Sequence, residues 1–164
     1  MSAGQVRPEF EARCDLFRER NLRLMASDGR LRALVLQAKE LGVRIVLSDL
    51  DDGFLGLCDN DNAKIYIDVG LSPSEFLSTL AHEVGHAIHG HGRGGVAEFE
   101  DAAARWAAEF LIDSAEWATY CRVYGGVRVA FFSECFGVTE DVVRDFHRLR
   151  KSKGAEMREL DRVE

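Results

Sequence analysis

One five-residue motif, His82-Glu83-Val84-Gly85-His86, carries the side chains of this chain that are best suited to do chemistry. On a helix, positions i and i+4 lie on one face, about 6 Å apart along the axis. His82 and His86 can therefore bind one metal ion, and zinc is well suited to neutral imidazole ligands. Glu83 would lie beside the open position of that ion, as general base on the bound water. The motif predicts a zinc-dependent hydrolase, against the alternative of two exposed histidines around an unrelated glutamate.

The residues around the motif have the features of a well-defined helix. Ser72-Pro73-Ser74-Glu75 is typical of a helix start, because Ser72 and Glu75 can form a capping box and proline suits the first turn. Gly90 and the glycines after it can end the helix. Between these limits apolar side chains recur every three or four residues and form one broad face: Phe76, Leu77, Leu80, Ala81, Val84, Ala87 and Ile88. We therefore expect a buried amphipathic helix with both histidines near its C-terminal end.

A catalytic zinc site needs a third protein ligand, which must come from outside this pair. The candidates are His89, His91, Glu98, Glu100, Asp101 and the distant His147. His89 follows His82 by seven residues, about 10.5 Å along a helix, which is too far for both to bind one ion. The metzincin spacing is absent, because it needs a glycine at position 89 and a histidine at position 92.

A second helix, expected from Val96 to Ile112, offers the best third ligand. Its many alanines would let it pack closely against the histidine helix, and Glu100 lies on the alanine face. Glu98 lies at the helix start, and Asp101 is about 100° away around the axis. Glu100 is therefore the preferred ligand, with Glu98 as the second candidate.

The remaining segments predict an α+β fold. Residues 43–50, 53–58 and 63–69 have the alternation and the β-branched content of strands. We expect them to form a small antiparallel three-stranded sheet, packed on the histidine helix and on the helix that bears Glu100. The acidic stretch Asp59-Asn60-Asp61-Asn62 is interpreted as a hairpin turn, because the central glycine and terminal glutamate of a calcium loop are absent.

The chain divides into four expected parts. They are an N-terminal helical arm (1–28), a catalytic core (29–113), a C-terminal helical subdomain (114–151) and a charged tail (152–164). Within the subdomain, residues 127–136 and 140–150 resemble a helix-turn-helix. Acids at the start of its second helix would repel phosphate, and the chain has 28 acidic against 21 basic residues. Nucleic acid is therefore not an expected partner.

Cysteine content and hydropathy indicate the cellular compartment. The four cysteines are widely spread and form no C-x-x-C pair, which favours free thiols over a disulfide framework. The first 25 residues contain no continuous apolar stretch, and no run reaches the length of a membrane helix. We expect no signal peptide, no membrane contact and a cytoplasmic location.

The combined pattern resembles the ImmA/IrrE family of metallo-endopeptidases, gluzincin-type enzymes related to thermolysin. Three segments carry the resemblance: residues 64–67 (KIYI), 80–86 (LAHEVGH) and 100–112 (EDAAARWAAEFLI). The resemblance extends over residues 43–150 and is greatest for the short, phage-type members. The sequence departs from the family at Asp113-Ser114, where a proline is usual, and residues 1–28 have no counterpart.

The resemblance implies a minimal zincin catalytic domain, in which two histidines and a glutamate bind zinc. It implies a cytoplasmic endopeptidase that cleaves a DNA-binding transcriptional repressor and so switches on phage, mobile-element or stress genes. It also implies that residues 63–69 form an edge strand along which substrate could pair. A second donor to the transition state is implied too, with Tyr120, Tyr124 and His147 as candidates. The alternative is a non-catalytic, zinc-stabilised protein that binds a regulator.

Overall fold

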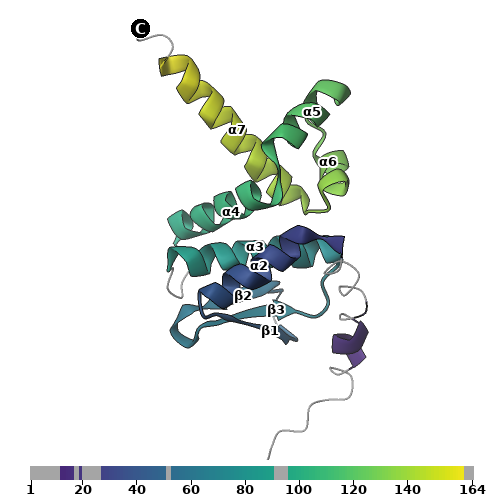
Figure 1. Ribbon diagram of the computed structural model, residues 1–164, viewed down its shortest axis with the longest axis vertical. Helices are drawn as coiled ribbons and strands as arrows, with labels where there is room; N and C mark the ends of the chain where they lie inside the picture. The colour runs from purple at the N-terminus through teal and green to yellow at the C-terminus, as the bar shows by residue number, and fades with distance from the viewer. Residues whose placement is uncertain (1–11, 17–18, 20–26, 51–52, 91–95, 161–164) are drawn as a thin grey trace, which may run out of the picture.

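The protein places a small sheet beneath a stack of helices, as the computed structural model in Figure 1 shows. The structure describes residues 12–16, 19, 27–50, 53–90 and 96–160. After a helical segment at residues 12–16, the described elements are α2 (Gly29–Glu40), β1 (Arg44–Ser48), β2 (Gly56–Asp59), the 3-10 turn η1 (Asn60–Asn62), β3 (Lys64–Asp68), α3 (Pro73–His89), α4 (Ala97–Leu111), α5 (Ser114–Tyr124), α6 (Val129–Phe136) and α7 (Glu140–Leu160). The predicted α+β class is confirmed.

The sheet has the strand order β1-β3-β2 and is mixed. The central strand β3 runs parallel to β1, with Ile45 opposite Ile65, and antiparallel to β2, with Cys58 opposite Ile65. The prediction of a purely antiparallel sheet was wrong, because β1 lies beside β3 and runs parallel to it. Only β2 and β3 are joined by a hairpin, and between β1 and β2 the chain crosses to the opposite edge of the sheet. The expectation that residues 63–69 form an edge strand was also wrong.

The turn between β2 and β3 is closed by polar side chains. The carboxylate of Asp59 accepts hydrogen bonds from the backbone nitrogen and the side-chain amide of Asn62, at 3.2 and 2.9 Å. Asn60 donates from Nδ2 to the carbonyl oxygen of His86 at 3.4 Å, which fastens the turn to α3. The interpretation of this acidic stretch as a hairpin turn is confirmed.

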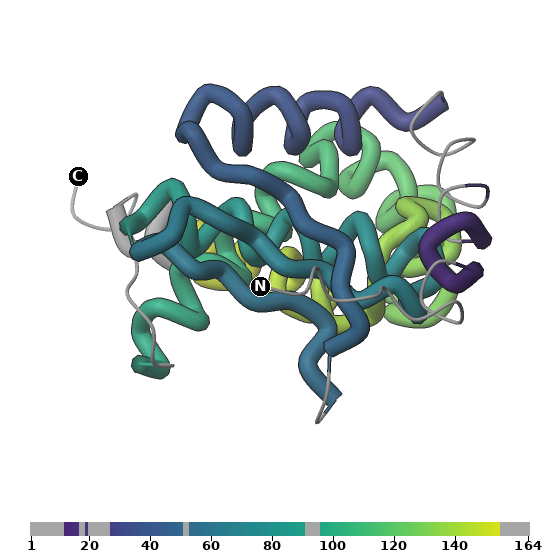
Figure 2. Tube along the Cα trace, turned by 90° about the horizontal axis from the view of Figure 1, so that it is seen from below, coloured from purple at the N-terminus to yellow at the C-terminus, as the bar shows by residue number. Residues whose placement is uncertain are grey.

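One face of the sheet packs on α2 and α3, as Figures 1 and 2 show from two directions. Ile65 and Ile67 are fully buried on that face, whereas Lys64 and Tyr66 alternate with them and are partly exposed. Helix α3 forms the middle layer, with the sheet on one side and α4 on the other (Figure 1). The capping box predicted at Ser72 and Glu75 is present, and Gly90 ends α3 in the left-handed conformation.

The C-terminal helices extend the apolar core above α4. Trp117 of α5 contacts the rings of Phe132 and Phe146, with centroids 5.0 Å apart in each pair. The first turns of α7 bury Val142 and Val143. The helix, turn and helix expected for residues 127–150 are therefore present, and the buried face of α7 packs on its neighbours.

Helix α7 continues to Leu160, beyond the end expected near Arg150. Gly154 does not end it, because most residues on either side favour a helix. Lys153 adds an ion pair with Glu109 of α4. Part of the segment expected as a charged tail is thus helical.

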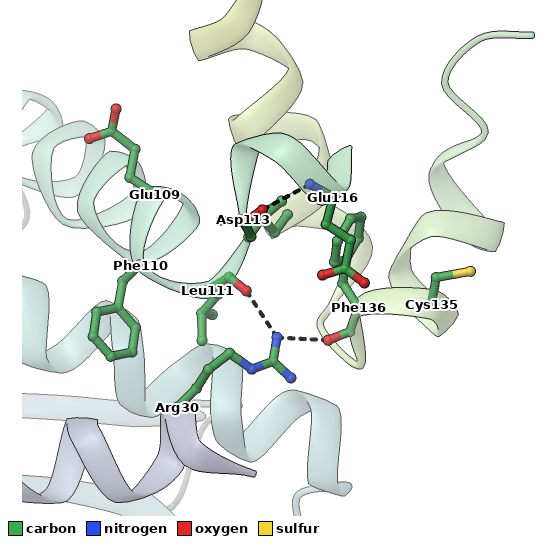
Figure 3. A pocket seen from close by; sticks show the side chains of 9 residues that line it. Arg30, Glu109, Phe110, Leu111, Asp113, Glu116, Cys135 and Phe136 are labelled. Atoms are coloured by element: carbon green, nitrogen blue, oxygen red, sulfur yellow. Dashed lines mark hydrogen bonds between the residues drawn. The ribbon is translucent and has the colours of Figure 1, made fainter. Parts of the chain in front are cut away.

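Arg30, at the start of α2, joins three helices (Figure 3). Its Nη1 donates to the carbonyl oxygens of Leu111 at 2.9 Å and Phe136 at 2.8 Å, which are the last residues of α4 and α6. Its Nη2 lies 2.6 Å from Oδ2 of Asp28. A cation at these C-terminal ends satisfies carbonyl groups that have no partner within their helices. Arg30 lines the surrounding pocket of about 440 Å³, and all three of its guanidinium nitrogens have hydrogen-bond partners.

Little of the predicted N-terminal arm is described. Residues 12–16 are helical, and Arg13 forms ion pairs with Asp49 and Asp68 beside the ends of β1 and β3. Apart from residues 19, 27 and 28, the rest of that prediction lies outside the described residues. Among the described helices, none is long and apolar enough to cross a membrane. The cysteines are free, and their exposure rises in the order Cys14 and Cys58 (buried), Cys121 (intermediate) and Cys135 (exposed).

Candidate metal centre

Two histidines of α3 and one glutamate of α4 meet above the middle layer. Nε2 of His82 lies 3.1 Å from Nε2 of His86 and 3.1 Å from Oε2 of Glu100. Nε2 of His86 lies 3.5 Å from Oε1 of Glu100. The three side chains therefore direct their ligand atoms to one point, and these atoms all lie within 4.8 Å of one another.

The spacing of these atoms fits a small divalent metal ion. Ligand atoms at about 2.0–2.1 Å from a tetrahedral zinc ion lie about 3.3 Å from one another. The three closest separations, 3.1, 3.1 and 3.5 Å, bracket this value. Two imidazoles, one carboxylate and an open position are also the donor set of many catalytic zinc sites. In the described part of the chain, His82, His86 and Glu100 are the group that could hold a metal.

The alanine face of α4 allows Glu100 to reach the histidines. Ala103 and Ala107 are buried on that face, and Ala103 meets Gly85 where the two helices cross. Small residues at a crossing let helix backbones approach closely. The first turn of α4 is thereby held next to the last turns of α3, as the alanine pattern predicted.

The other candidate ligands are placed elsewhere. Nδ1 of His89 donates to a backbone carbonyl of its own helix at 2.7 Å. Asp101 forms an ion pair with Arg105 at 3.5 Å. Glu98 lines a separate surface pocket together with His89. His91 lies outside the described residues.

The candidates for a second transition-state donor belong to the aromatic cluster of the C-terminal helices. The rings of Tyr120 and Tyr124 stack with their centroids 6.0 Å apart. His147 lies over Trp117, with the ring centroids 6.2 Å apart. The described residues that line the pocket beside the metal ligands do not include these three side chains. The structure therefore does not bring them to the site.

Glu83 lies beside the cluster and is only 8% exposed. Burial raises the pKa of its carboxyl to about 7, and the charge of Glu100 also raises this pKa. A hydrogen bond from the backbone of Cys58 acts in the opposite direction. A metal cation would lower the pKa as well. A carboxyl group in this range can both accept and release a proton near neutral pH.

Strand β2 approaches Glu83 closely at Gly56. A β carbon on Gly56 would lie 2.9 Å from Cγ and 3.0 Å from Oε1 of Glu83, and 2.6 Å from Cγ2 of Thr79. Only glycine allows the strand to lie this near to the carboxylate. Gly56 was not among the residues predicted for the site, although a glycine inside a predicted strand is a known sign of close backbone approach.

A pocket of about 310 Å³ opens beside the site. The start of α7 supplies one of its walls, and a hydrogen bond from the backbone nitrogen of Thr139 to Oγ of Ser78, 3.0 Å long, fastens this start to α3. The lining residues are Leu55 and Gly56 beside and on β2, Ser78, Thr79, His82 and Glu83 on α3, Ala104 and Ala107 on α4, and Thr139, Asp141, Val142 and Asp145 at the start of α7. The C-terminal helices thus complete the cleft, which no local sequence pattern indicated.

Comparison with known proteins agrees with this geometry. Residues 38–148 match the Peptidase M78 family, described as the IrrE N-terminal-like domain. The match covers more than half of the chain and includes both helices that carry the candidate metal site. No curated protein matches the sequence. The matched length, together with the His82, His86 and Glu100 geometry, shows that the chain belongs to the Peptidase M78 (ImmA/IrrE) family of metallopeptidases.

Proposed function

We propose that the protein is a zinc-dependent endopeptidase in which His82, His86 and Glu100 bind the metal and Glu83 is the general base. The observation that carries this proposal is the convergence of three ligand atoms within 4.8 Å, next to a buried carboxylate that lines an open pocket. Bound zinc would acidify a water molecule and polarise the scissile carbonyl.

Glu83 would take the proton of the attacking water and pass it to the leaving nitrogen. Its burial keeps the carboxylate out of bulk water, and the hydrogen bond from Cys58 holds it in one orientation. The close approach of Gly56 limits the space in which the side chain could turn away. The chain therefore supplies a base that is positioned before substrate arrives.

The outer edge of β2 is the place where we propose that substrate pairs. The backbone nitrogen of Asp68 donates to the carbonyl oxygen of Leu55 at 3.0 Å, so that Leu55 faces β3. Alternate residues of an antiparallel strand face opposite edges, and the polar backbone groups of Gly56 therefore face away from β3. The bond from Cys58 to Glu83 agrees with this alternation. An extended peptide added along Gly56 would pass the metal ligands.

Metal content tests the site. We expect about one zinc per chain in the wild-type protein, as in catalytic sites of this ligand set. Zinc binding should be lost or greatly weakened in His82→Ala and in Glu100→Ala. Glu98→Ala is the matched control, because this acid lies on the same helix and was the second candidate, and it should retain zinc. Loss of zinc in the Glu98 variant with retention in the Glu100 variant would overturn the ligand assignment.

Replacement of Glu83 by Gln tests the catalytic role. The variant should bind zinc almost as the wild type does and should lose proteolysis, because the amide cannot accept the proton of water. A non-catalytic regulator-binding protein would keep its effect on the regulator after this change. Survival of regulator release in Glu83→Gln would therefore favour binding over proteolysis.

We propose a DNA-binding transcriptional repressor as the substrate, in the cytoplasm, with release of phage, mobile-element or stress genes as the result. The resemblance to the ImmA/IrrE family supports this proposal. Co-expression with repressors encoded next to the gene, analysed by intact mass, would test it. Defined fragments should appear with the wild type and be absent with Glu83→Gln.

A further inference from the structure

Asp145 is a carboxylate of the metal pocket that the proposed chemistry does not use. It lies on the second turn of α7, and its side chain is 19% exposed. It lines the pocket together with His82 and Glu83. Its partner is Arg148 on the same helix, with Nη2 2.8 Å from Oδ1, and the side chain of Arg148 is 71% exposed. The ion pair thus engages Oδ1 with an exposed partner, while Asp145 itself lines the pocket.

His82 has one ring nitrogen that the cluster does not use. Its contacts with His86 and with Glu100 are both made by Nε2. A neutral imidazole that binds metal through Nε2 carries its proton on Nδ1. Metal-binding histidines almost always donate this second N–H to a carboxylate, a carbonyl or a water, which fixes the ring. Nδ1 of His82 therefore requires an acceptor.

The contact between α4 and α7 places Asp145 on the wall of the pocket that His82 also lines. Asp145 also lines a second pocket, with Asp101 and Ala104, so that it lies where the two helices meet. Ala104 follows Glu100 by one helical turn and offers only a methyl group, which leaves room for a side chain from α7. Burial raises the pKa of Asp145, whereas the charges of Arg148 and of His82 lower it. His82 and this carboxylate line the same pocket.

We propose that Asp145 is a positioning residue for His82. Nδ1 donates to a water that in turn donates to this carboxylate, and the bridge holds the ring with Nε2 directed at the metal. The inference rests on the proposed metal site and extends it from α3 and α4 to α7. It gives the C-terminal helices a direct part in metal binding.

Zinc affinity, measured by competition with a chromogenic chelator, tests this proposal without any substrate. Asp145→Ala should weaken zinc binding by about 10–100-fold, the range found when such outer partners are removed. Asp145→Asn keeps an acceptor oxygen and should weaken zinc binding less than Asp145→Ala does. The matched control is Asp141→Asn, which removes the same charge from the same pocket at a side chain that is 87% exposed. It should change the affinity by less than about threefold, because exposed charges are well screened.

Each other outcome is decisive. If Asp141→Asn and Asp145→Asn weaken zinc binding equally, the loss comes from the charge of the pocket and not from a specific contact of Asp145. That result would overturn the proposal. Wild-type affinity in a folded Asp145→Ala variant would also overturn it. If Asp145→Ala fails to fold, the near-isosteric Asp145→Asn decides, with unchanged thermal unfolding of the metal-free protein as its check. Absence of zinc binding in the wild type would instead show that the proposed metal site itself is wrong.

Discussion

Gly85 of α3 lies directly against the backbone of Ala103 of α4. A β carbon built on Gly85 would be 3.0 Å from both the Cα and the carbonyl oxygen of Ala103. Such separations are shorter than ordinary van der Waals contact, and backbone atoms cannot move aside as a flexible side chain can. The two helices are therefore as close as they can be next to the metal ligands, and this closeness sets the distance from Glu100 to the histidines.

Gly85→Ala should separate the two helices and damage the metal site. The added methyl group overpacks the crossing, and we expect a loss of about 1–3 kcal/mol in the free energy of unfolding. Zinc affinity should fall by about tenfold or more, because ligand distances must hold within about 0.2 Å. Urea unfolding of the metal-free protein and a zinc competition titration measure the two effects.

Gly154→Ala is the matched control for the Gly85 variant. Gly154 also lies within a helix, but among the described residues no atom beyond its own stretch of helix lies within 4 Å of a β carbon built on it. This change should stabilise α7 by about 0.5–1 kcal/mol through the usual helix preference for alanine. It should leave zinc affinity unchanged. Similar results for both variants would show that the crossing does not control the site.

Gly56→Ala should separate catalysis from metal binding. The new β carbon would collide with Cγ2 of Thr79 and with Cγ of Glu83, and neither residue is one of the proposed metal ligands. A misplaced base can cost about 100-fold in rate. We expect hydrolysis of fluorescent casein to fall by about this factor while zinc affinity stays near that of the wild type. Leu57→Ala, at the next and 42% exposed residue, is the control and should keep the activity.

Much of the metal site could be predicted from the sequence because its signals are local. The spacing of His82 and His86, and the capping box at Ser72, depend on residues within one helix. Glu100 could be selected because the alanine face of α4 indicates which side of that helix packs closely. The helix crossing then follows from small residues on both helices.

The sheet order and the wall formed by α7 could not be predicted in this way. Strand pairing between β1 and β3 depends on a crossover that leaves no mark in either strand. Asp145 follows Glu100 by 45 residues, and its place beside the pocket depends on how α7 packs on α4. Hydrophobic periodicity showed which face of α7 is buried but gave no information on the helix it meets.

Arg30→Met should destabilise the whole fold without touching the metal site. The guanidinium donates to the carbonyl oxygens of Leu111 and Phe136 and to Asp28, and methionine keeps most of the apolar stem. Hydrogen bonds of charged groups contribute about 1.5–3 kcal/mol each, so that a loss of about 3 kcal/mol or more is expected. Arg32→Met, at an exposed position of the same helix, is the control and should change stability by less than about 0.5 kcal/mol.

The pairing of Arg30 with the Asp28 carboxylate should make part of the unfolding free energy depend on pH. A side-chain hydrogen bond from Arg30 is the main cause that lowers the pKa of Asp28 below its ordinary value of 3.8, and burial opposes it. Because the folded-state pKa is below the unfolded one, the unfolded chain binds more protons between these two values. The stabilisation is therefore complete above pH 3.8 and is lost as the pH falls through the lower, folded-state value.

Asp28→Asn isolates this contribution, because asparagine can still cap α2 but cannot titrate. The measurement is the difference in unfolding free energy between wild type and variant, followed by urea unfolding from pH 6 down to about pH 2.5 in a chelator. A chelator is needed because protonation of histidines would otherwise release metal in the same experiment. The wild type should be the more stable protein by a constant amount at the upper end, and its advantage should shrink below pH 3.8. A constant difference in unfolding free energy over the whole pH range would mean that the pairing of the Asp28 carboxylate with Arg30 does not stabilise the folded protein.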